Sequence, residues 1–266
     1  MSKKYEFVAG DEKVVNGVTL KRIRSLVFIP ATTSTPEVNI GDIGGYIEHE
    51  SNLDNSVTSR AWVYSDAWVY SDACVYGDAR IHGDACVYGN AGVSGDAWVS
   101  GNARVSGDAW VSGNACVYGN AGVYGNAHVS GNACVYGNAG VYGNAGVYGN
   151  AHVYGVACVY GDACVSDNAC VYGIACVYGN AGVSGNARVY NDNMLFWASK
   201  VGTENGTLTV FNTKSNNLLV TKGCFIGTPE EFLEASRKKH DPVTFREYQL
   251  LIEVATSRIT KARKQI

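Results

Sequence analysis

Ala103-Arg104-Val105-Ser106-Gly107-Asp108 is one unit of a six-residue pattern that continues from Ala61 to Tyr190 with no inserted or deleted residue. The unit reads Ala-x-Val-(Tyr or Ser)-Gly-(Asn or Asp), with few departures. Every sixth residue from Ala61 to Ala187 is alanine, and Ile81 is the one exception among the valines. A strict short period of this kind is typical of a solenoid, in which successive coils of the chain stack on one another.

The order of residues within the unit indicates how each coil is built. Side chains alternate between the faces of an extended segment, so Ala and Val share one face and the residues flanking Val share the other. Small apolar residues suit a narrow interior, and Gly-Asn or Gly-Asp accepts the positive φ of a corner. Three units make one triangular coil, and coils stack about 4.8 Å apart. The 23 aliphatic positions from Val57 to Val189 predict between seven and eight coils of a parallel β-helix.

The flanking sequence predicts a further unit before the solenoid. We expect an N-terminal β-hairpin unit over residues 1–37, because Asn16-Gly17 lies between two β-forming segments. The parallel β-helix is expected over residues 38–192. Within it, residues 38–56 form an irregular first coil and residues 57–192 the regular coils, since a terminal repeat has to cap an open sheet edge.

The C-terminal part, residues 193–266, lacks the six-residue period. Its β-forming segments predict a meander of three strands, Leu195–Ser199, Thr207–Asn212 and Leu218–Thr221. Thr228-Pro229 and Asp241-Pro242 are typical helix starts, so two helices are expected after the meander. In the second helix an apolar stripe at helical spacing is expected to pack on the meander or on the last coil: Phe245, Tyr248, Ile252, Ala255 and Ile259.

The composition favours a soluble protein of the cytosol. The 266-residue chain has neither an apolar run long enough for a membrane span nor a signal-like N-terminus. Its net charge of −3 includes −6 over residues 61–192 and +4 over residues 193–266. The acidic coil region argues against a nucleic-acid groove. Eight of the nine cysteines occupy the variable position of the repeat, so we expect reduced thiols and not disulfides.

Equivalent residues of successive coils lie above one another, which sorts the outward side chains into three faces. Two faces carry unbroken runs of tyrosine: Tyr118, Tyr136, Tyr154, Tyr172 and Tyr190 on one, and Tyr124, Tyr142, Tyr160 and Tyr178 on the other. Two aligned corners carry Val156 and Ile174 in place of Asn or Asp. Exposed aromatic and apolar surface usually marks a contact. At the Val156/Ile174 corner we expect either a second copy of the chain or the chain's own C-terminal unit.

The hexads resemble the left-handed parallel β-helix of the hexapeptide-repeat proteins, whose aliphatic position falls on Val63 and its successors. Two other stretches, Gly41–Glu48 and Lys222–Phe232, are similar to segments that flank such hexads in a group of phage and prophage proteins. The second stretch includes the Gly-Cys-Phe-x-Gly-Thr module of Gly223–Thr228. The resemblance implies the left hand of the helix, a phage or prophage origin, and a homo-oligomer with the trimer favoured. It brings no known reaction.

Many hexapeptide-repeat proteins are acyltransferases with a catalytic histidine, so an acyltransferase-like enzyme is the first alternative function. His128 and His152 are the candidate bases in that interpretation. No loop interrupts the coils, however, and the only nearby carboxylates are corner aspartates. Cys116, Cys134, His152 and Cys170 also stack, but four ligands along a line are too far apart for one tetrahedral zinc ion. We therefore predict no catalytic residue, no metal and no other cofactor.

The favoured interpretation is a non-catalytic binding protein, since a rigid, loop-free solenoid presents surfaces for a small ligand or a host protein. A phage protein of this kind would act in host takeover or defence evasion in the host cytoplasm. A signalling nucleotide is one candidate ligand: its base would stack on tyrosine and its phosphates would meet Arg80, Arg104, Arg188 or the basic C-terminal part. A structural spacer of a virion or tail is the second alternative. Membranes and nucleic acids are not expected as partners.

Overall fold

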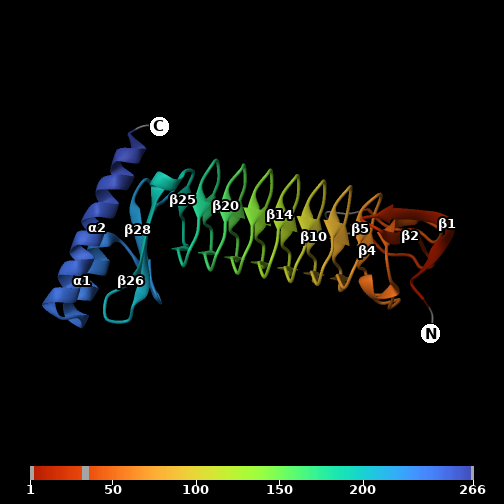
Figure 1. The fold of residues 1–266 in the computed structure, drawn as a ribbon, viewed down its shortest axis with the longest axis horizontal. Coiled ribbons are helices and arrows are strands. Elements are labelled where there is room, and N and C mark those ends of the chain that lie inside the picture. Colours follow the sequence, from red (N-terminus) through yellow and green to blue (C-terminus); the bar gives the residue numbers. More distant parts are fainter. Residues whose placement is uncertain (1–2, 32–35, 265–266) are drawn as a thin grey trace. The chain divides into compact units, whose positions relative to one another are not determined.

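The computed structural model describes residues 3–31 and 36–264. The chain forms two compact units, Met1–Asn138 and Ala139–Ile266, and β-strands dominate both (Figure 1). Residues 1–2, 32–35 and 265–266, which belong to the predicted terminal units, lie outside the described residues. The predicted fold class is confirmed: the protein is mainly β, with a parallel β-solenoid, an N-terminal hairpin, a C-terminal antiparallel sheet and two helices.

The N-terminal hairpin consists of β1 (Tyr5–Val15) and β2 (Val18–Ser25), which pair antiparallel. The turn residues Asn16 and Gly17 have φ of 51° and 83°, a conformation that asparagine and glycine tolerate best. β2 also pairs antiparallel with β3 (Ile43–Ile47), and β3 pairs parallel with β5 (Trp68–Val69). The hairpin therefore extends one sheet of the solenoid beyond its first coil.

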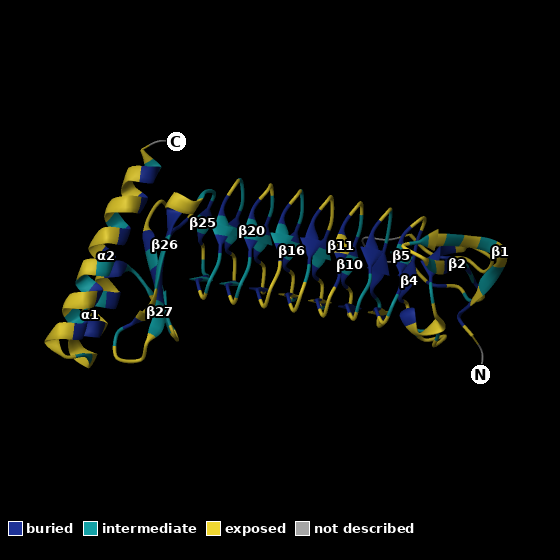
Figure 2. Cartoon of the chain, viewed as in Figure 1, coloured by how far each residue is buried: buried dark blue, intermediate teal, exposed yellow. Residues whose placement is uncertain are grey.

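The solenoid segment of the first unit is made of short strands, each paired parallel with the equivalent strand of the next coil, three hexads later. The pairing gives the three predicted sheets. The repeat alanines and valines are no more than 1 % exposed, so they form the interior (Figure 2). Besides β5, the strands are β4 (Trp62–Val63), β6 (Cys74–Val75), β7 (Arg80–Ile81), β8 (Cys86–Val87), β9 (Gly92–Val93), β10 (Trp98–Val99), β11 (Arg104–Val105), β12 (Trp110–Val111), β13 (Cys116–Val117), β14 (Gly122–Val123), β15 (His128–Val129) and β16 (Cys134–Val135).

The start of the regular coils differs from the prediction. Val57 is predicted as the first interior position, but it is 44 % exposed and belongs to no strand. Ile47 pairs with Val69 and Leu53 bridges to Val75, and both separations are longer than the three hexads of a regular coil. The extra residues after Leu53 push Val57 out of the coil, and the regular interior begins at Val63. The short helix η1 (Glu50–Asn52) lies in this irregular coil.

The corners explain the glycine of the repeat. Gly107 has a φ of +73°, and a Cβ added there would lie 2.9 Å from the backbone nitrogen of Gly125 in the next coil. Both the left-handed backbone and the close approach therefore select glycine. Ser71 occupies the equivalent corner position of an earlier coil with a φ of 59°, so the fold accepts an L-residue at that corner.

We expect Gly107→Ala to lower the free energy of unfolding by about 1–2 kcal/mol, because alanine resists the left-handed conformation. The contact with Gly125 adds to this loss. Ser71→Ala, at a corner that already holds an L-residue, is the matched control and should change stability by less than about 0.5 kcal/mol. Urea unfolding followed by circular dichroism measures both variants, and equal losses would contradict the explanation.

The second unit begins with the same short strands, again paired parallel between equivalent positions of successive coils. Their alanines and valines are no more than 1 % exposed. The short helix η2 (Asp192–Met194) ends the repeat. The strands are β17 (Gly140–Val141), β18 (Gly146–Val147), β19 (His152–Val153), β20 (Cys158–Val159), β21 (Cys164–Val165), β22 (Cys170–Val171), β23 (Cys176–Val177), β24 (Gly182–Val183) and β25 (Arg188–Val189).

An antiparallel sheet follows in chain order: β26 (Leu195–Val201), β27 (Gly206–Asn212), β28 (Leu218–Lys222) and β29 (Phe225–Gly227). The sequence predicts the first three strands. It misses β29, which is too short to show a recognisable alternation. The helices α1 (Pro229–Lys239) and α2 (Pro242–Arg263) begin after the predicted caps Thr228 and Asp241.

The apolar stripe of α2 packs on the antiparallel sheet, which is one of the two predicted places. Tyr248, Ile252, Ala255 and Ile259 share a buried cluster with sheet residues such as Val210, whereas the predicted Phe245 is only half-buried and lies outside this cluster. The C-terminal sheet and helices thus form one core within the second unit. Across residues 3–31 and 36–264, no helix has the combination of length and apolar character needed to cross a lipid bilayer.

Candidate functional site

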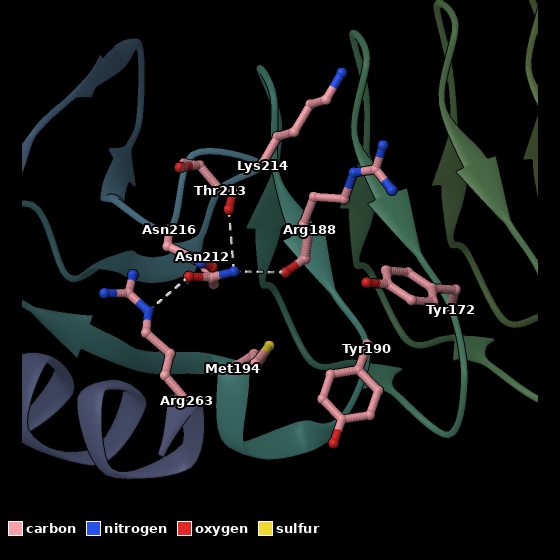
Figure 3. Close-up of a pocket in the computed structure, with 9 residues that line it drawn as sticks. All are labelled: Tyr172, Arg188, Tyr190, Met194, Asn212, Thr213, Lys214, Asn216 and Arg263. Carbon is pink, nitrogen blue, oxygen red and sulfur yellow. Dashed lines mark hydrogen bonds between the residues drawn. The ribbon is translucent and has the colours of Figure 1, made fainter. Parts of the chain in front are cut away.

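The second unit contains a cavity of about 750 Å³ where its last coil meets the antiparallel sheet and the C-terminal end of α2 (Figure 3). Small-molecule sites usually measure about 300–1,000 Å³. The lining residues are Tyr172, Arg188, Tyr190, Met194, Asn212, Thr213, Lys214, Asn216 and Arg263. Among these described lining residues there is no carboxylate, histidine or cysteine.

Tyr172 and Tyr190 form the aromatic part of the cavity wall. They hold the same repeat position in consecutive coils, and their ring centroids are 6.1 Å apart with 40° between the planes. Tyr154 stacks on Tyr172 with a centroid distance of 5.1 Å and an angle of 11°. The ladder is therefore close to parallel until Tyr190, which tilts at the cavity.

Arg188, Lys214 and Arg263 bring three positive charges to the cavity from three elements. Arg188 holds the variable repeat position on β25, Lys214 lies in the turn after β27, and Arg263 is the last residue of α2. Among the described residues, none of the three forms an ion pair with a carboxylate. Cations that are not neutralised by the protein itself favour an anionic ligand.

Asn212 forms hydrogen bonds that connect several residues of the cavity wall. It is 3 % exposed, and its Oδ1 accepts a hydrogen bond from Arg263 Nε at 2.7 Å. Its Nδ2 donates to the carbonyl oxygens of Arg188 at 3.3 Å and Thr213 at 3.1 Å. Arg263 Nη2 also donates to the carbonyl oxygen of Asn217 at 2.9 Å, and burial lowers the pKa of the Arg263 guanidinium. Asn212 therefore links the last coil to the end of α2 within this unit.

The rest of the lining supplies apolar surface and a hydroxyl that is already hydrogen-bonded. Met194, which is 4 % exposed, contributes apolar surface. The Thr213 hydroxyl donates to the carbonyl oxygen of Asn217 at 3.2 Å and accepts from its N–H at 3.1 Å. The described lining residues include no carboxylate, histidine or cysteine that could activate this hydroxyl.

Tyr172, Tyr190 and Arg188 are the predicted site residues that the structure brings together in this cavity. Sequence reasoning missed Lys214 and Arg263, along with the Asn212 that holds the wall. These three residues lie outside the repeat, and their local sequence does not distinguish them from other polar residues. The net charge of +4 over residues 193–266 is the one signal that pointed to this part of the chain.

The second tyrosine ladder of the same unit lies on another face. Tyr142 and Tyr160 stack at 5.0 Å, and Tyr160 and Tyr178 at 5.1 Å, with 4° between the planes of each pair. Trp197 packs edge-on against Tyr178 at 4.3 Å. This ladder therefore ends against a ring of the antiparallel sheet and not at the large cavity.

In the first unit the predicted tyrosines pack against neighbouring residues on the surface of the coils. Tyr118 and Tyr136 stack at 4.8 Å with 2° between their planes. The Tyr124 ring lies over Gly122, where an added Cβ would overlap it. The small residue at position 122 therefore accommodates the ring, a packing role that the sequence did not predict.

The predicted phosphate contact by Arg80 is contradicted, because the side chain of Arg80 is buried. It is 2 % exposed, its Nη1 donates to the hydroxyl of Tyr64, and its Nη2 donates to the carbonyl oxygen of Pro30 at 3.5 Å. Burial lowers the pKa of its guanidinium. Arg104 is exposed and lines a separate cavity of about 400 Å³ in the first unit, and Tyr88 is another of the lining residues.

Val156 and Ile174 lie at the predicted apolar corner and are 50 % and 67 % exposed. The N–H of Val156 donates to the carbonyl oxygen of Gly173 at 2.9 Å, so the corner is as regular as its neighbours. The sheet and helices of the same unit leave both side chains open. Docking of the chain's own C-terminal unit on this corner is therefore not observed.

His128 and His152 lie on strands of different units, β15 and β19. His152 is registered with Cys170 on the next coil. Neither histidine lines the 750 Å³ cavity. Within the described ranges 3–31 and 36–264, no group of three or more His, Cys, Asp or Glu side chains is placed to hold a metal ion.

Residues 97–113 match the family model of the YdcK beta solenoid repeat. The chain thus carries a β-solenoid repeat by sequence comparison as well as by structure. The matched segment spans β10 to β12 of the first unit and does not include the cavity residues. A comparison with curated proteins finds no match to the chain.

Proposed function

We propose that the protein is a non-catalytic binding protein whose second unit holds a phosphorylated aromatic ligand of the nucleotide class. One observation carries the proposal: the cavity wall combines two tyrosine rings with three cations, and its described lining residues include no carboxylate. Stacking of a base on an aromatic side chain contributes about 1–3 kcal/mol. Arginine binds phosphate oxygens through charge-assisted hydrogen bonds. A ligand with a flat ring and a phosphate uses both parts of the wall.

The proposed setting follows from the resemblance to phage and prophage proteins. In the cytoplasm of a host cell, a protein that binds a signalling nucleotide lowers its free concentration and so weakens the host response. Sequestration needs no turnover, in agreement with the lack of a carboxylate, histidine or cysteine among the described lining residues. It needs a preorganised site, and the pairing of β25 with β22 supplies a fixed backbone under Arg188.

We expect Arg188→Gln to weaken nucleotide binding by about 10- to 100-fold, because a hydrogen bond to a charged group contributes about 1.5–3 kcal/mol. Arg246→Gln, the same change at an exposed arginine of α2 that does not line the cavity, is the matched control and should leave the affinity unchanged. Isothermal titration calorimetry with purine and pyrimidine monophosphates, triphosphates and cyclic dinucleotides measures both variants.

Tyr190→Leu separates the aromatic part of the wall from the cations. It should weaken binding of the nucleotide while leaving the weaker binding of inorganic pyrophosphate unchanged, because pyrophosphate has no ring to stack. The proposal fails if the unaltered protein binds none of these nucleotides, or if the Arg188 and Arg246 variants lose affinity equally.

We further propose that the exposed Val156/Ile174 corner is a contact between copies of the chain, with the trimer favoured by the family resemblance. The double variant Val156→Asp/Ile174→Asp should dissociate the oligomer, because burying a carboxylate in an apolar contact is unfavourable. Native mass spectrometry measures the assembly, and circular dichroism checks that the fold is kept. Val243→Asp, at a side chain that is 80 % exposed on α2, is the control. An unchanged mass for the double variant would contradict this assignment.

A further inference from the structure

Two pairs of cysteines face each other across neighbouring coils. Cys116 on β13 is registered with Cys134 on β16 in the first unit, and Cys158 on β20 with Cys176 on β23 in the second. All four side chains are half-buried on outward faces. Each Sγ donates to the backbone carbonyl oxygen two residues earlier in the chain, at 3.7–4.0 Å, so the two thiols of a pair have the same orientation. The register of the solenoid therefore places two cysteine side chains next to each other at two separate positions.

The remaining coil cysteines have different neighbours. Cys164 lies between Gly146 and Gly182, and Cys170 between His152 and Arg188. Cys74 is registered with Gly92, and Cys86 with Trp68 and Arg104. These lone thiols share the repeat position and the strand geometry of the paired ones. They are natural controls for any property that depends on pairing.

The distance between neighbouring coils determines whether a registered cysteine pair can form a disulfide or bind a bridging metal ion. Side chains of registered residues on parallel strands point the same way, about 4.8 Å apart. A disulfide needs its two Cβ atoms about 3.5–4.5 Å apart, so a direct S–S bond would require the coils to approach. A single ion with metal–sulfur bonds of about 2.3 Å on opposite sides spans about 4.6 Å. The pair is therefore better matched to a bridging ion than to a disulfide.

The ligand set selects the ion. Among the described residues, no third His, Cys, Asp or Glu joins either pair in a metal-binding group. Zinc sites use four ligands, and calcium and magnesium require oxygen ligands. Two sulfurs alone suit a soft monovalent d¹⁰ ion, which accepts two ligands on opposite sides, and thiolates select Cu(I).

We propose that Cys116/Cys134 and Cys158/Cys176 each bind one Cu(I) ion in two-coordinate geometry. Each thiol loses its proton to solvent, so Cu⁺ and two thiols give a bis-thiolate complex of charge −1 and two protons. Copper keeps its oxidation state, and no oxidant or reductant is consumed. The proposal is independent of the nucleotide cavity, because none of the four cysteines is among the described residues that line it.

Titration of the reduced, metal-free full chain with Cu(I) under anaerobic conditions tests the proposal, with a chromophoric Cu(I) chelator as competitor. The full chain should retain two equivalents. Cys134→Ser and Cys176→Ser should each retain one, and the double variant none. Cys164→Ser and Cys170→Ser should retain two, and X-ray absorption should show two sulfur ligands per copper.

Three results would overturn the proposal: no retention by the unaltered chain, two equivalents retained by the double variant, or equal losses in the Cys170→Ser control. Circular dichroism of each variant guards against loss of the fold. If the double variant is misfolded, the two single variants and their controls still decide the outcome, because each removes one pair and leaves the other.

Discussion

Hydrogen bonds between backbone groups in neighbouring parallel coils are the constraint on which the rest of the structure depends. The N–H of Trp98 donates to the carbonyl oxygen of Ala115, and the N–H of Ser100 to that of Val117, both at 2.9 Å. These bonds fix the register, so a residue type repeated in the sequence is repeated in space. Corner asparagines form ladders for this reason: Asn102 Nδ2 donates to Asn120 Oδ1 at 3.0 Å. Tyrosine stacks and cysteine pairs have the same origin.

The strict period is also the reason that much of the fold could be predicted. Alanine and valine define the interior, and a separation of three hexads defines the neighbours, without any knowledge of distant contacts. The prediction failed at Val57, where the hydrophobic period suggests one more interior position. Extra residues before Trp62 shift the frame there, as the pairing of Ile47 with Val69 and the bridge from Leu53 to Val75 show. Periodicity thus predicts register well inside the repeat and poorly at its edge.

The cavity could be predicted from the sequence less completely than the fold. The repeat places Tyr172, Tyr190 and Arg188 in the last coils, and this could be read from the sequence. Lys214 and Arg263 reach the same cavity only because the antiparallel sheet and α2 pack where they do, and no short-range pattern encodes that approach. The prediction that Arg80 contacts phosphate is wrong for a related reason. Its burial depends on Tyr64 and on the carbonyl of Pro30, far earlier in the chain.

The antiparallel strand beside the last coil limits the addition of further parallel strands to the repeat. In the second unit Ala187 bridges antiparallel to Thr213, and the N–H of Lys214 donates to the carbonyl oxygen of Asn186 at 2.9 Å. Stacked parallel strands at this spacing have the geometry of cross-β fibrils, which grow by adding identical edges. An edge already occupied by an antiparallel neighbour cannot accept another parallel strand. The chain therefore combines a fibril-like repeat with a cap on the β25 edge, where the antiparallel neighbour and not the repeat prevents the addition of a parallel strand.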